Sequence, residues 1–332
     1  MEFCARRWKE EMMAGKPKGL LILSFPVAKK MGISVRELLG SSENQARGML
    51  EIIRCFPKQC AIVSRMDLSV EAQAFGASVR FEENDVPVVE TPVVRSVEDA
   101  NRLQVPDWKT SRCAIDVEAV RQVAASGPDR PVFAGVIGPY SLAGRLMDVM
   151  EIMIQCMMDP DLVHRVLRKA TDFLKEYIRA YKEAGAQGVV MAEPLAGLIS
   201  PDMVRDFSTA YIREIVDELQ DDSFVIIYHN CGAGVLASIQ EIAATGCFAY
   251  HFGNAVAMEQ VLEAMDPDTL VFGNLDPVAL FQNGTPKQVE EAVDALIKRC
   301  GTFPNWVVSS GCDIPARASW ENIERFYESL PE

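Results

Sequence analysis

Short apolar runs alternate along the chain with longer stretches in which apolar residues recur every three to four positions. The stretch 159–185 is typical of the longer segments, because it opens on Asp159 and Pro160 and ends at Gly185, as helices do. An apolar run followed by a helix, repeated many times, predicts parallel β/α units. The runs that we predict as strands are 20–25, 61–66, 132–137, 188–193, 224–229, 248–252, 270–275 and 306–310.

The number of predicted units decides between the two common parallel architectures. Eight strands in about 300 residues predict a closed (β/α)8 barrel of the TIM type rather than an open, doubly wound sheet. Residues 1–19 are expected to form an N-terminal helical extension, and 76–131 to be an insertion. Because no linker rich in proline, glycine or serine interrupts the pattern, we predict a single domain over residues 1–332.

The composition limits which binding partners and which cellular compartment we expect. A formal net charge of −14, with no cluster of lysine or arginine, disfavours binding to nucleic acid. No apolar run reaches the roughly 18 residues of a membrane-spanning helix, and the N-terminus lacks the apolar core of a secretory signal. The nine cysteines are odd in number and scattered, which indicates a reducing compartment. We therefore expect a cytoplasmic protein without a membrane partner.

Polar residues follow most of the predicted strands, at the end of a barrel where active sites form. His229 ends the run 224–229 and Cys231 follows it, while Cys312 follows the last run. One imidazole and two thiolates fill three positions of a zinc tetrahedron and leave the fourth open, as in catalytic zinc sites. Ordinary burial is the alternative, since a His-x-Cys pair also arises by chance. Gly232 and Gly311 are expected to let the backbone turn tightly beside the metal.

Several longer segments resemble the uroporphyrinogen decarboxylase superfamily. They are MDLSVEAQAFGASVRF (66–81), VFAGVIGPYSLAGRLM (132–147), AGAQGVVMAEPLAGLISPDMVRDF (184–207), LVFGNLDPVAL (270–280) and SSGCDIPARASWENI (309–323). The resemblance runs over nearly the whole chain in one register. It implies a single distorted (β/α)8 barrel with an active-site cleft at the carboxyl ends of the strands.

Two chemistries occur within that superfamily, and the chain departs from one of them. The metal-free decarboxylases carry arginines after the first strand and a histidine after the last. This chain reads SFPVAKKMG (24–32) at the first place and has Cys312 at the second, although it keeps their aspartate as Asp67. His229, Cys231 and Cys312 instead match the zinc pattern of the methylcobamide:coenzyme M methyltransferases. The resemblance thus implies Zn²⁺ and methyl transfer from a corrinoid to a small thiol substrate such as coenzyme M.

The corrinoid is expected on a separate corrinoid protein, because the chain has no Asp-x-His-x-x-Gly pattern for binding one. Another thiol or a folate stays open as the methyl acceptor. Two other functions also stay open: a metal-free decarboxylase-like enzyme, and a non-catalytic barrel that binds a thiol or a corrinoid.

Other polar residues near strand ends are candidates for supporting roles. Glu193 is a candidate fourth zinc ligand or base, or a carboxylate that binds a loop amide. Asp67 is a catalytic candidate through its match to the decarboxylases, with a cleft-lining role as the alternative. His251 is a candidate partner of the metal-bound imidazole and a substrate-binding candidate, or a buried, hydrogen-bonded histidine.

The remaining candidates concern substrate binding. Asn274 is one, although it also suits the turn after the run 270–275. Arg65 is a second, as a partner for a sulfonate, and Arg145 is an alternative to it.

Overall fold

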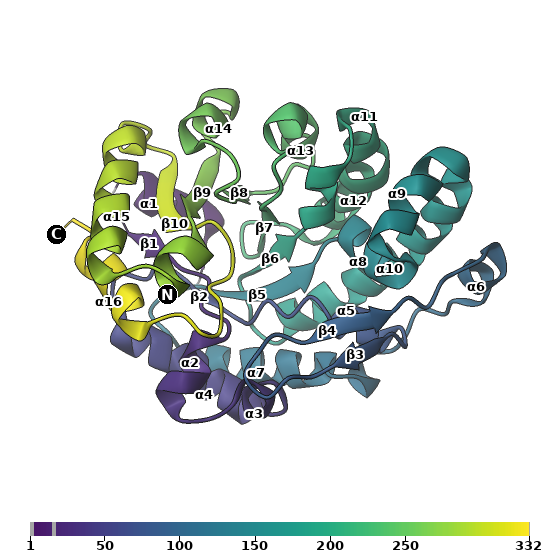
Figure 1. Ribbon diagram of the computed structural model, residues 1–332, viewed down its shortest axis with the longest axis horizontal. Coiled ribbons are helices and arrows are strands. Elements are labelled where there is room, and N and C mark those ends of the chain that lie inside the picture. Colours follow the sequence, from purple (N-terminus) through teal and green to yellow (C-terminus); the bar gives the residue numbers. More distant parts are fainter. Residues whose placement is uncertain (1–2, 15–17, 332) are drawn as a thin grey trace.

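The computed structural model describes residues 3–14 and 18–331 and contains a curled sheet of eight parallel strands (Figure 1). Their order in space is β1-β10-β9-β8-β7-β6-β5-β2. This arrangement confirms the predicted barrel of β/α units. The parallel strands are β1 (Gly19–Leu20), β2 (Ile62–Val63), β5 (Val132–Ile137), β6 (Gly188–Ala192), β7 (Val225–Asn230), β8 (Ala249–Phe252), β9 (Leu270–Leu275) and β10 (Trp306–Ser310).

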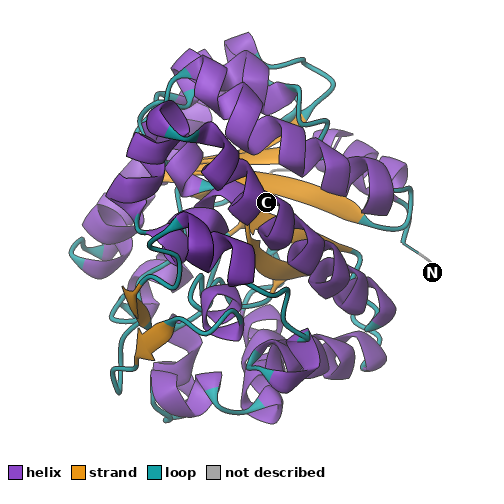
Figure 2. Cartoon of the chain, turned by 90° about the vertical axis from the view of Figure 1, so that its right-hand side faces the viewer, coloured by secondary structure: helices purple, strands orange, loops and turns teal. Residues whose placement is uncertain are grey.

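Helices surround the strands, as Figure 2 shows, because each parallel connection must cross back over the sheet. The α-helices are α1 (Ala5–Ala14), α2 (Pro26–Met31), α3 (Val35–Leu39), α4 (Ser42–Cys55), α5 (Val70–Ala74), α6 (Val97–Arg102), α7 (Cys113–Ala125), α8 (Pro139–Met147), α9 (Val149–Met158), α10 (Pro160–Glu183), α11 (Pro201–Val204), α12 (Ala210–Leu219), α13 (Ile239–Ala243), α14 (Met258–Ala264), α15 (Pro286–Cys300) and α16 (Trp320–Glu328). Short 3-10 or π-helical segments are η1 (Trp108–Thr110), η2 (Pro194–Leu198), η3 (Arg205–Thr209), η4 (Leu236–Ser238) and η5 (Pro277–Gln282).

Helix α10 shows how the sequence sets these elements. Its N-cap Asp159 accepts a hydrogen bond from the amide of Leu162 at 3.1 Å, and Pro160 occupies the first turn, where no backbone donor is needed. The helix ends before Gly185, which adopts a φ of +96°. The predicted bounds are therefore confirmed, and the apolar stripe faces the sheet.

The barrel is distorted where β1 and β2 approach each other. Each forms a ladder of only two residues, shorter than the predicted runs 20–25 and 61–66, and one bridge between Gly19 and Gln59 joins the two edges. Side chains replace the missing ladder bonds: the Gln59 amide exchanges two hydrogen bonds with the backbone of Leu21, at 3.0 and 2.9 Å. The seam between β1 and β2 is thus closed partly by backbone hydrogen bonds of Gly19 and partly by the Gln59 side chain.

The segment before β1 covers the amino ends of the strands. On α1, the Trp8 ring packs against Phe133, Phe248 and Phe272, with ring centroids 5.1, 6.3 and 6.2 Å apart. The predicted N-terminal helix is therefore present, although residues 1, 2 and 15–17 of the predicted extension lie outside the described residues. Because α1 closes the amino end of the barrel, a ligand can enter only from the carboxyl end of the strands.

The predicted insertion 76–131 forms an antiparallel hairpin, β3 (Ser78–Arg80) with β4 (Val88–Thr91), followed by α6, η1 and α7. In Figure 2 the hairpin lies apart from the main strands. Within residues 3–14 and 18–331, no helix is both long and apolar enough to cross a membrane.

Candidate metal centre

The first two candidate ligands come from the end of β7. Side chains alternate along a strand, so His229 and Cys231 face one side while Asn230 faces the other. The Asn230 amide donates to the carbonyl of Glu193 at 2.9 Å, and its oxygen accepts from the amide of Gly232 at 2.8 Å. Asn230 therefore holds the turn that presents Cys231.

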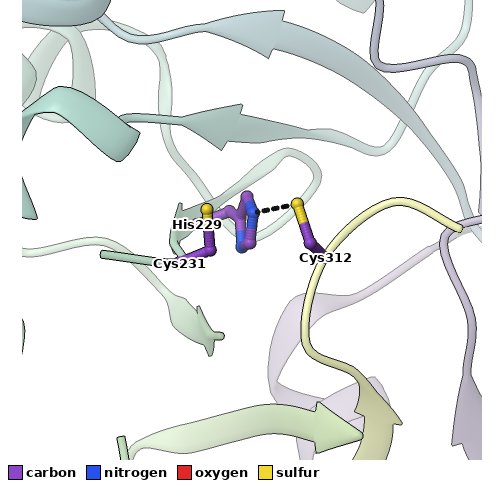
Figure 3. Close-up of side chains that lie close together, drawn as sticks. All are labelled: His229, Cys231 and Cys312. Carbon is purple, nitrogen blue, oxygen red and sulfur yellow. Dashed lines mark hydrogen bonds between the residues drawn. The ribbon is translucent and has the colours of Figure 1, made fainter. Parts of the chain in front are cut away.

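The third candidate ligand, Cys312, comes from the loop after β10. Strands β7 and β10 are separated by β8 and β9 in the sheet, yet the curl of the barrel brings their ends together. His229 Nε2 lies 3.5 Å from Cys312 Sγ, and one ligand atom from each of His229, Cys231 and Cys312 falls within 4.8 Å of the others (Figure 3). The structure thus brings together the three residues predicted to bind zinc.

Glycines let the backbone crowd around this cluster. A Cβ on Gly253 would stand 2.5 Å from the Cα of Cys231, and one on Gly232 would stand 2.8 Å from the Cα of Gly197. We expected Gly232 and Gly311 to supply special turn conformations, but neither has a positive φ. Their role is close approach between chain segments rather than backbone freedom.

A chain of hydrogen bonds holds the His229 ring from behind. His229 Nδ1 lies 2.7 Å from His251 Nδ1, and His251 Nε2 lies 2.8 Å from the Ser309 hydroxyl. That hydroxyl donates to the carbonyl of Leu20, a group that can only accept. Since the single hydroxyl proton is used there, His251 Nε2–H must donate to Ser309.

The direction of these hydrogen bonds determines which ring nitrogen of His229 carries the proton. Burial, together with the neighbouring His229 ring, lowers the pKa of His251 well below its usual value, so His251 is neutral. Its Nδ1 then has a lone pair and accepts from His229 Nδ1–H. His229 Nε2 is therefore left unprotonated on the side of Cys312, as a metal ligand requires.

The two thiols also affect each other. Hydrogen bonding from the Cys312 thiol lowers the pKa of Cys231, against the effect of burial and with help from His229. The same contact raises the pKa of Cys312. The pair therefore gives up its first proton easily and holds the second, and a cation that binds both sulfurs must displace that second proton.

The donor set fits zinc, and so does the separation between His229 and Cys312. At usual Zn–N and Zn–S lengths, a tetrahedral site puts nitrogen and sulfur ligands about 3.6 Å apart. The observed His229–Cys312 separation is 3.5 Å. Thiolate and imidazole are also the donors that zinc prefers over the hard cations magnesium and calcium.

Glu193 lies at the end of β6 and is fully buried. Its carboxylate accepts hydrogen bonds from the amides of Tyr140 at 3.0 Å and Ser141 at 2.5 Å, so it caps the first turn of α8. Burial nevertheless raises the pKa of Glu193 to about 7. Among the described residues, the cluster of possible metal ligands contains His229, Cys231 and Cys312 but not Glu193. A role of Glu193 as ligand or base stays a prediction.

Asp67 and Arg65 lie in a separate buried cluster of ion pairs. Arg65 contacts Asp67 at 2.9 Å and also pairs with Asp116, while Arg112 contacts Asp67 at 2.7 Å. Burial opposes ionisation of Asp67, but Arg65 and Arg112 outweigh it and lower its pKa. The Arg65 side chain is only 4% exposed and already paired. Arg65 is therefore held within the scaffold by its ion pairs, and its contact with substrate stays a prediction.

Asn274 is buried and builds a loop. Its amide donates to the carbonyls of Gly253 and Val256 at 2.9 and 2.8 Å, which orders the segment after β8. A direct contact with substrate stays a prediction.

A pocket of about 410 Å³ is lined by residues that include Phe25, Met66, Arg145 and Asp313. Asp313 directly follows Cys312, and its carboxylate accepts from the amide of Ser24 at 3.1 Å. Sequence reasoning missed Asp313, whose place beside Cys312 was the available clue. It also missed Ser309, Arg112 and Asp116, whose roles depend on contacts between distant segments.

Comparison with protein families places this geometry in context. Residues 22–332 match the family described as uroporphyrinogen decarboxylase (URO-D). The chain belongs to the URO-D family. The predicted resemblance is confirmed, including that to the methylcobamide:coenzyme M methyltransferases within it.

Relatives of both kinds resemble this URO-D family member. A uroporphyrinogen decarboxylase from Hydrogenovibrio crunogenus is 25% identical over 326 residues, covering 95% of this chain and 90% of that protein. A methylcobamide:CoM methyltransferase from Methanosarcina acetivorans is also 25% identical, over 266 residues, covering 79% and 76%. Both groups of relatives are enzymes. Since the two identities are equal, overall similarity does not separate the two reactions.

Solved structures support the fold. A methyltransferase from Methanosarcina mazei superposes with a TM-score of 0.86 at 20% identity, covering 99% of this chain and 98% of that one. A B12-independent methionine synthase from a Shewanella species superposes with a TM-score of 0.61 at 14% identity, covering 95% of each chain. These two neighbours confirm the barrel.

Proposed function

We propose that this protein is a zinc-dependent methyltransferase that moves a methyl group from a methylated corrinoid to a thiol such as coenzyme M. The observation that carries the proposal is the convergence of His229 Nε2 with the sulfurs of Cys231 and Cys312. Three ligands leave one position of a tetrahedral metal free for substrate.

The chemistry of these ligands favours a thiol as substrate. When bound, zinc would hold the substrate sulfur as a thiolate at neutral pH, where a free thiol is mostly protonated. Two cysteine thiolates already cancel the charge of Zn²⁺, so Cys231 and Cys312 would keep the substrate sulfur electron-rich. Hydrolytic zinc sites more often use histidine and carboxylate ligands, which keep the metal a stronger Lewis acid.

Neighbouring residues of the protein hold the three candidate ligands in place. His251 and Ser309 hold the His229 ring in the tautomer whose Nε2 faces the thiols. Asn230 and Gly253 hold Cys231 against the end of β8. A fixed set of ligands presents the sulfur in one orientation, which favours an in-line attack on a methyl group.

In the proposed reaction the thiol first loses its proton to solvent. Its sulfur then forms a bond to the methyl carbon as the cobalt–carbon bond breaks. The electron pair of that bond stays on cobalt, which changes from Co(III) to Co(I), and the product is a thioether. We propose that a separate corrinoid protein brings the cofactor to the carboxyl end of the barrel.

The relatives that are decarboxylases supply a second candidate, a metal-free decarboxylation. Asp67 favours it, because the resemblance matches that residue to their catalytic aspartate. Against it, Asp67 is enclosed by Arg65 and Arg112, and the position of their histidine holds Cys312.

The test is methyl transfer in solution. The purified protein, loaded with zinc, is mixed with methylcobalamin and coenzyme M, and thioether formation is followed by mass spectrometry and cobalt oxidation state by absorbance. We expect turnover by the wild type and by Cys55→Ala, but none by Cys312→Ala. Cys55 is a matched control because it is a free cysteine outside the cluster. Full activity in the zinc-free protein, or decarboxylation of uroporphyrinogen without methyl transfer, would refute the proposal.

A further inference from the structure

The loop that carries Cys312 is anchored on both sides of that residue by its backbone. Before it, the Gly311 amide donates to the carbonyl of Leu275 on β9 at 2.6 Å. After it, the Ile314 amide donates to the carbonyl of Ile22 at 2.9 Å. In the part of the chain that the structure describes, neither Cys312 nor the residue after it makes a hydrogen bond between backbone groups. The segment between the two anchors therefore depends on side chains for its position.

Asp313 supplies the side chain that holds this segment. Its carboxylate accepts a hydrogen bond from the amide of Ser24 at 3.1 Å, and the Ser24 hydroxyl donates to the same carboxylate. Ser24 follows β1, which is the neighbour of β10 in the sheet. The amide of Asp313 also hydrogen-bonds to the sulfur of Cys312. Asp313 thus contacts both the candidate ligand and the adjacent part of the barrel.

Ser24 extends this connection to the end of β2. The amide of Met66 donates to the hydroxyl oxygen of Ser24 at 2.8 Å. Because an amide can only donate, the hydroxyl proton stays available for Asp313. The Cys312 loop is in this way tied to the seam between β1 and β2, where each strand forms a ladder of only two residues.

The charge of Asp313 does not explain its place beside a candidate ligand. A negative charge next to a thiol raises the pKa of the thiol, and Asp313 has this effect on Cys312, after the larger effects of Cys231 and of burial. The charge thus opposes the thiolate form that binds a metal. The contribution that remains is the set of hydrogen bonds to Ser24.

We propose that Asp313 is a positioning residue for the candidate metal centre and holds the sulfur of Cys312 in place by fixing its loop to Ser24. The inference rests on the proposed function only in taking Cys312 as a zinc ligand. Without the carboxylate, the segment between the two backbone anchors would be free to adopt other conformations. A metal would then have to order it on binding, at a cost in affinity.

The test compares the zinc affinity of four variants by competition with a zinc-binding dye. Asp313→Ala removes the hydrogen bonds, whereas Asp313→Asn removes the charge and keeps an oxygen that accepts from Ser24. Ser24→Ala keeps the amide donor and removes the hydroxyl. Asp85→Ala is the matched control, because Asp85 lines the same pocket of about 410 Å³ but pairs with Arg317, whose side chain is 72% exposed.

We expect Asp313→Ala to weaken zinc binding by about 10- to 100-fold, as loss of a residue that orients a metal ligand does. Ser24→Ala should weaken it by about 3- to 10-fold, as loss of one hydrogen bond does. Asp313→Asn and Asp85→Ala should bind zinc as the wild type does. Unchanged affinity in Asp313→Ala would overturn the inference. Equal losses in Asp313→Ala and Asp313→Asn would assign the effect to charge and would also overturn it.

Urea denaturation shows whether each variant folds. If Asp313→Ala does not fold, Ser24→Ala decides the question, since weaker zinc binding supports the inference and unchanged binding overturns it.

A second measurement needs neither zinc nor methyl transfer. In the reduced, zinc-free protein, mass spectrometry follows the alkylation of Cys312 by iodoacetamide, with Cys231 as the reference in the same molecule. Asp313→Ala and Asp313→Asn both lack the charge, so a difference between them reports on the loop. We expect Cys312 to react faster, relative to Cys231, in Asp313→Ala than in Asp313→Asn. Equal ratios in the two variants would contradict the positioning role.

These measurements separate the inference from the proposed function. Zinc binding that weakens in Asp313→Ala, without methyl transfer by the wild type, would support the positioning role and refute the reaction. Methyl transfer by the wild type, with unchanged zinc affinity in Asp313→Ala, would do the reverse. If the wild type binds no zinc, the proposed function fails and the alkylation of Cys312 alone decides the inference.

Discussion

Two buried polar clusters lie near the carboxyl end of the barrel, and they differ in how their atoms are satisfied. In the first, Arg65 and Arg112 share Asp67, and Arg65 also pairs with Asp116. In the second, His229 and two cysteines direct a lone pair and two sulfurs toward one another. We call them the ion-pair cluster and the ligand cluster.

The difference shows which kind of buried polarity indicates a binding site. The charges of the ion-pair cluster are matched within the chain, so the cluster stabilises the fold and needs no ligand. The ligand cluster offers only donors of electron pairs once its thiols ionise, and nothing in the described chain balances their charge. Both clusters contain polar residues that follow strands. They differ in whether positive and negative charges are matched within the cluster.

We expect the largest effect from a substitution that disrupts the ligand cluster. Cys312→Ala removes one of three ligands, and we expect zinc bound per chain to fall from about one to near zero. Metal analysis of purified protein measures it, with Cys55→Ala as the control that should retain zinc. Equal zinc in both variants would mean that the cluster is not the metal site.

We expect the next largest effect from a substitution that disrupts the ion-pair cluster. Asp67→Ala leaves two buried guanidinium groups short of a partner, and we expect it to lower the free energy of unfolding by about 3–5 kcal/mol. Urea denaturation measures the change, and zinc content should stay at the wild-type level. Asp129→Ala is the control, because Asp129 is 74% exposed and its pair with Arg130 should contribute less than about 1 kcal/mol. Loss of zinc without loss of stability would reverse the two assignments.

A smaller effect tests how the ligand cluster is oriented. His251→Ala removes the ring acceptor of His229 Nδ1–H and leaves only the backbone carbonyl at position 251, 3.2 Å away, to hold the metal-binding tautomer. We expect zinc affinity to fall by about 10- to 100-fold. Competition with a zinc-binding dye measures it. His164→Ala is the control, since His164 contacts Tyr211 on the outer helices. Unchanged affinity in His251→Ala would show that the hydrogen-bond chain does not support the metal.

The last effect concerns an exception beside the ion-pair cluster. Glu71 is buried, one of its oxygens has no partner, and burial raises its pKa from 4.5 to about 7. The folded state thus holds this proton more tightly than the unfolded state. Its contribution to stability is full below about pH 4.5 and is lost as pH rises toward about 7, by up to about 1.4 kcal/mol per pH unit.

Glu71→Gln tests this contribution, because an amide does not titrate in that range. The wild type should lose stability relative to the variant as pH rises from 4.5 to 7. Denaturation curves across that range measure the difference. Parallel curves would show that Glu71 has an ordinary pKa.

Local patterns were enough to predict the eight strands, helix α10 and the three residues that converge at the candidate metal centre. Each of these depends on periodicity, on a cap or on a position directly after a strand. Strands β1 and β2 were predicted too long, because Gln59 and other side chains replace the ladder there. No local pattern encodes that replacement.

The supporting residues were less predictable, because they depend on contacts between distant segments. Ser309 reaches His251 across 58 residues, and Arg65 reaches Asp116 across 51. Glu193 follows a strand as the ligands do, but the first turn of α8 occupies its carboxylate. Position after a strand therefore identified the candidates, and only the fold showed which of them converge.

X-ray absorption at the zinc edge tests the central claim most directly. We predict one nitrogen and two sulfur ligands at about 2.0 and 2.3 Å in the resting protein. Addition of the thiol should raise the count to three sulfurs. A protein without zinc, or a zinc site whose sulfur count stays constant when thiol is added, would contradict the account.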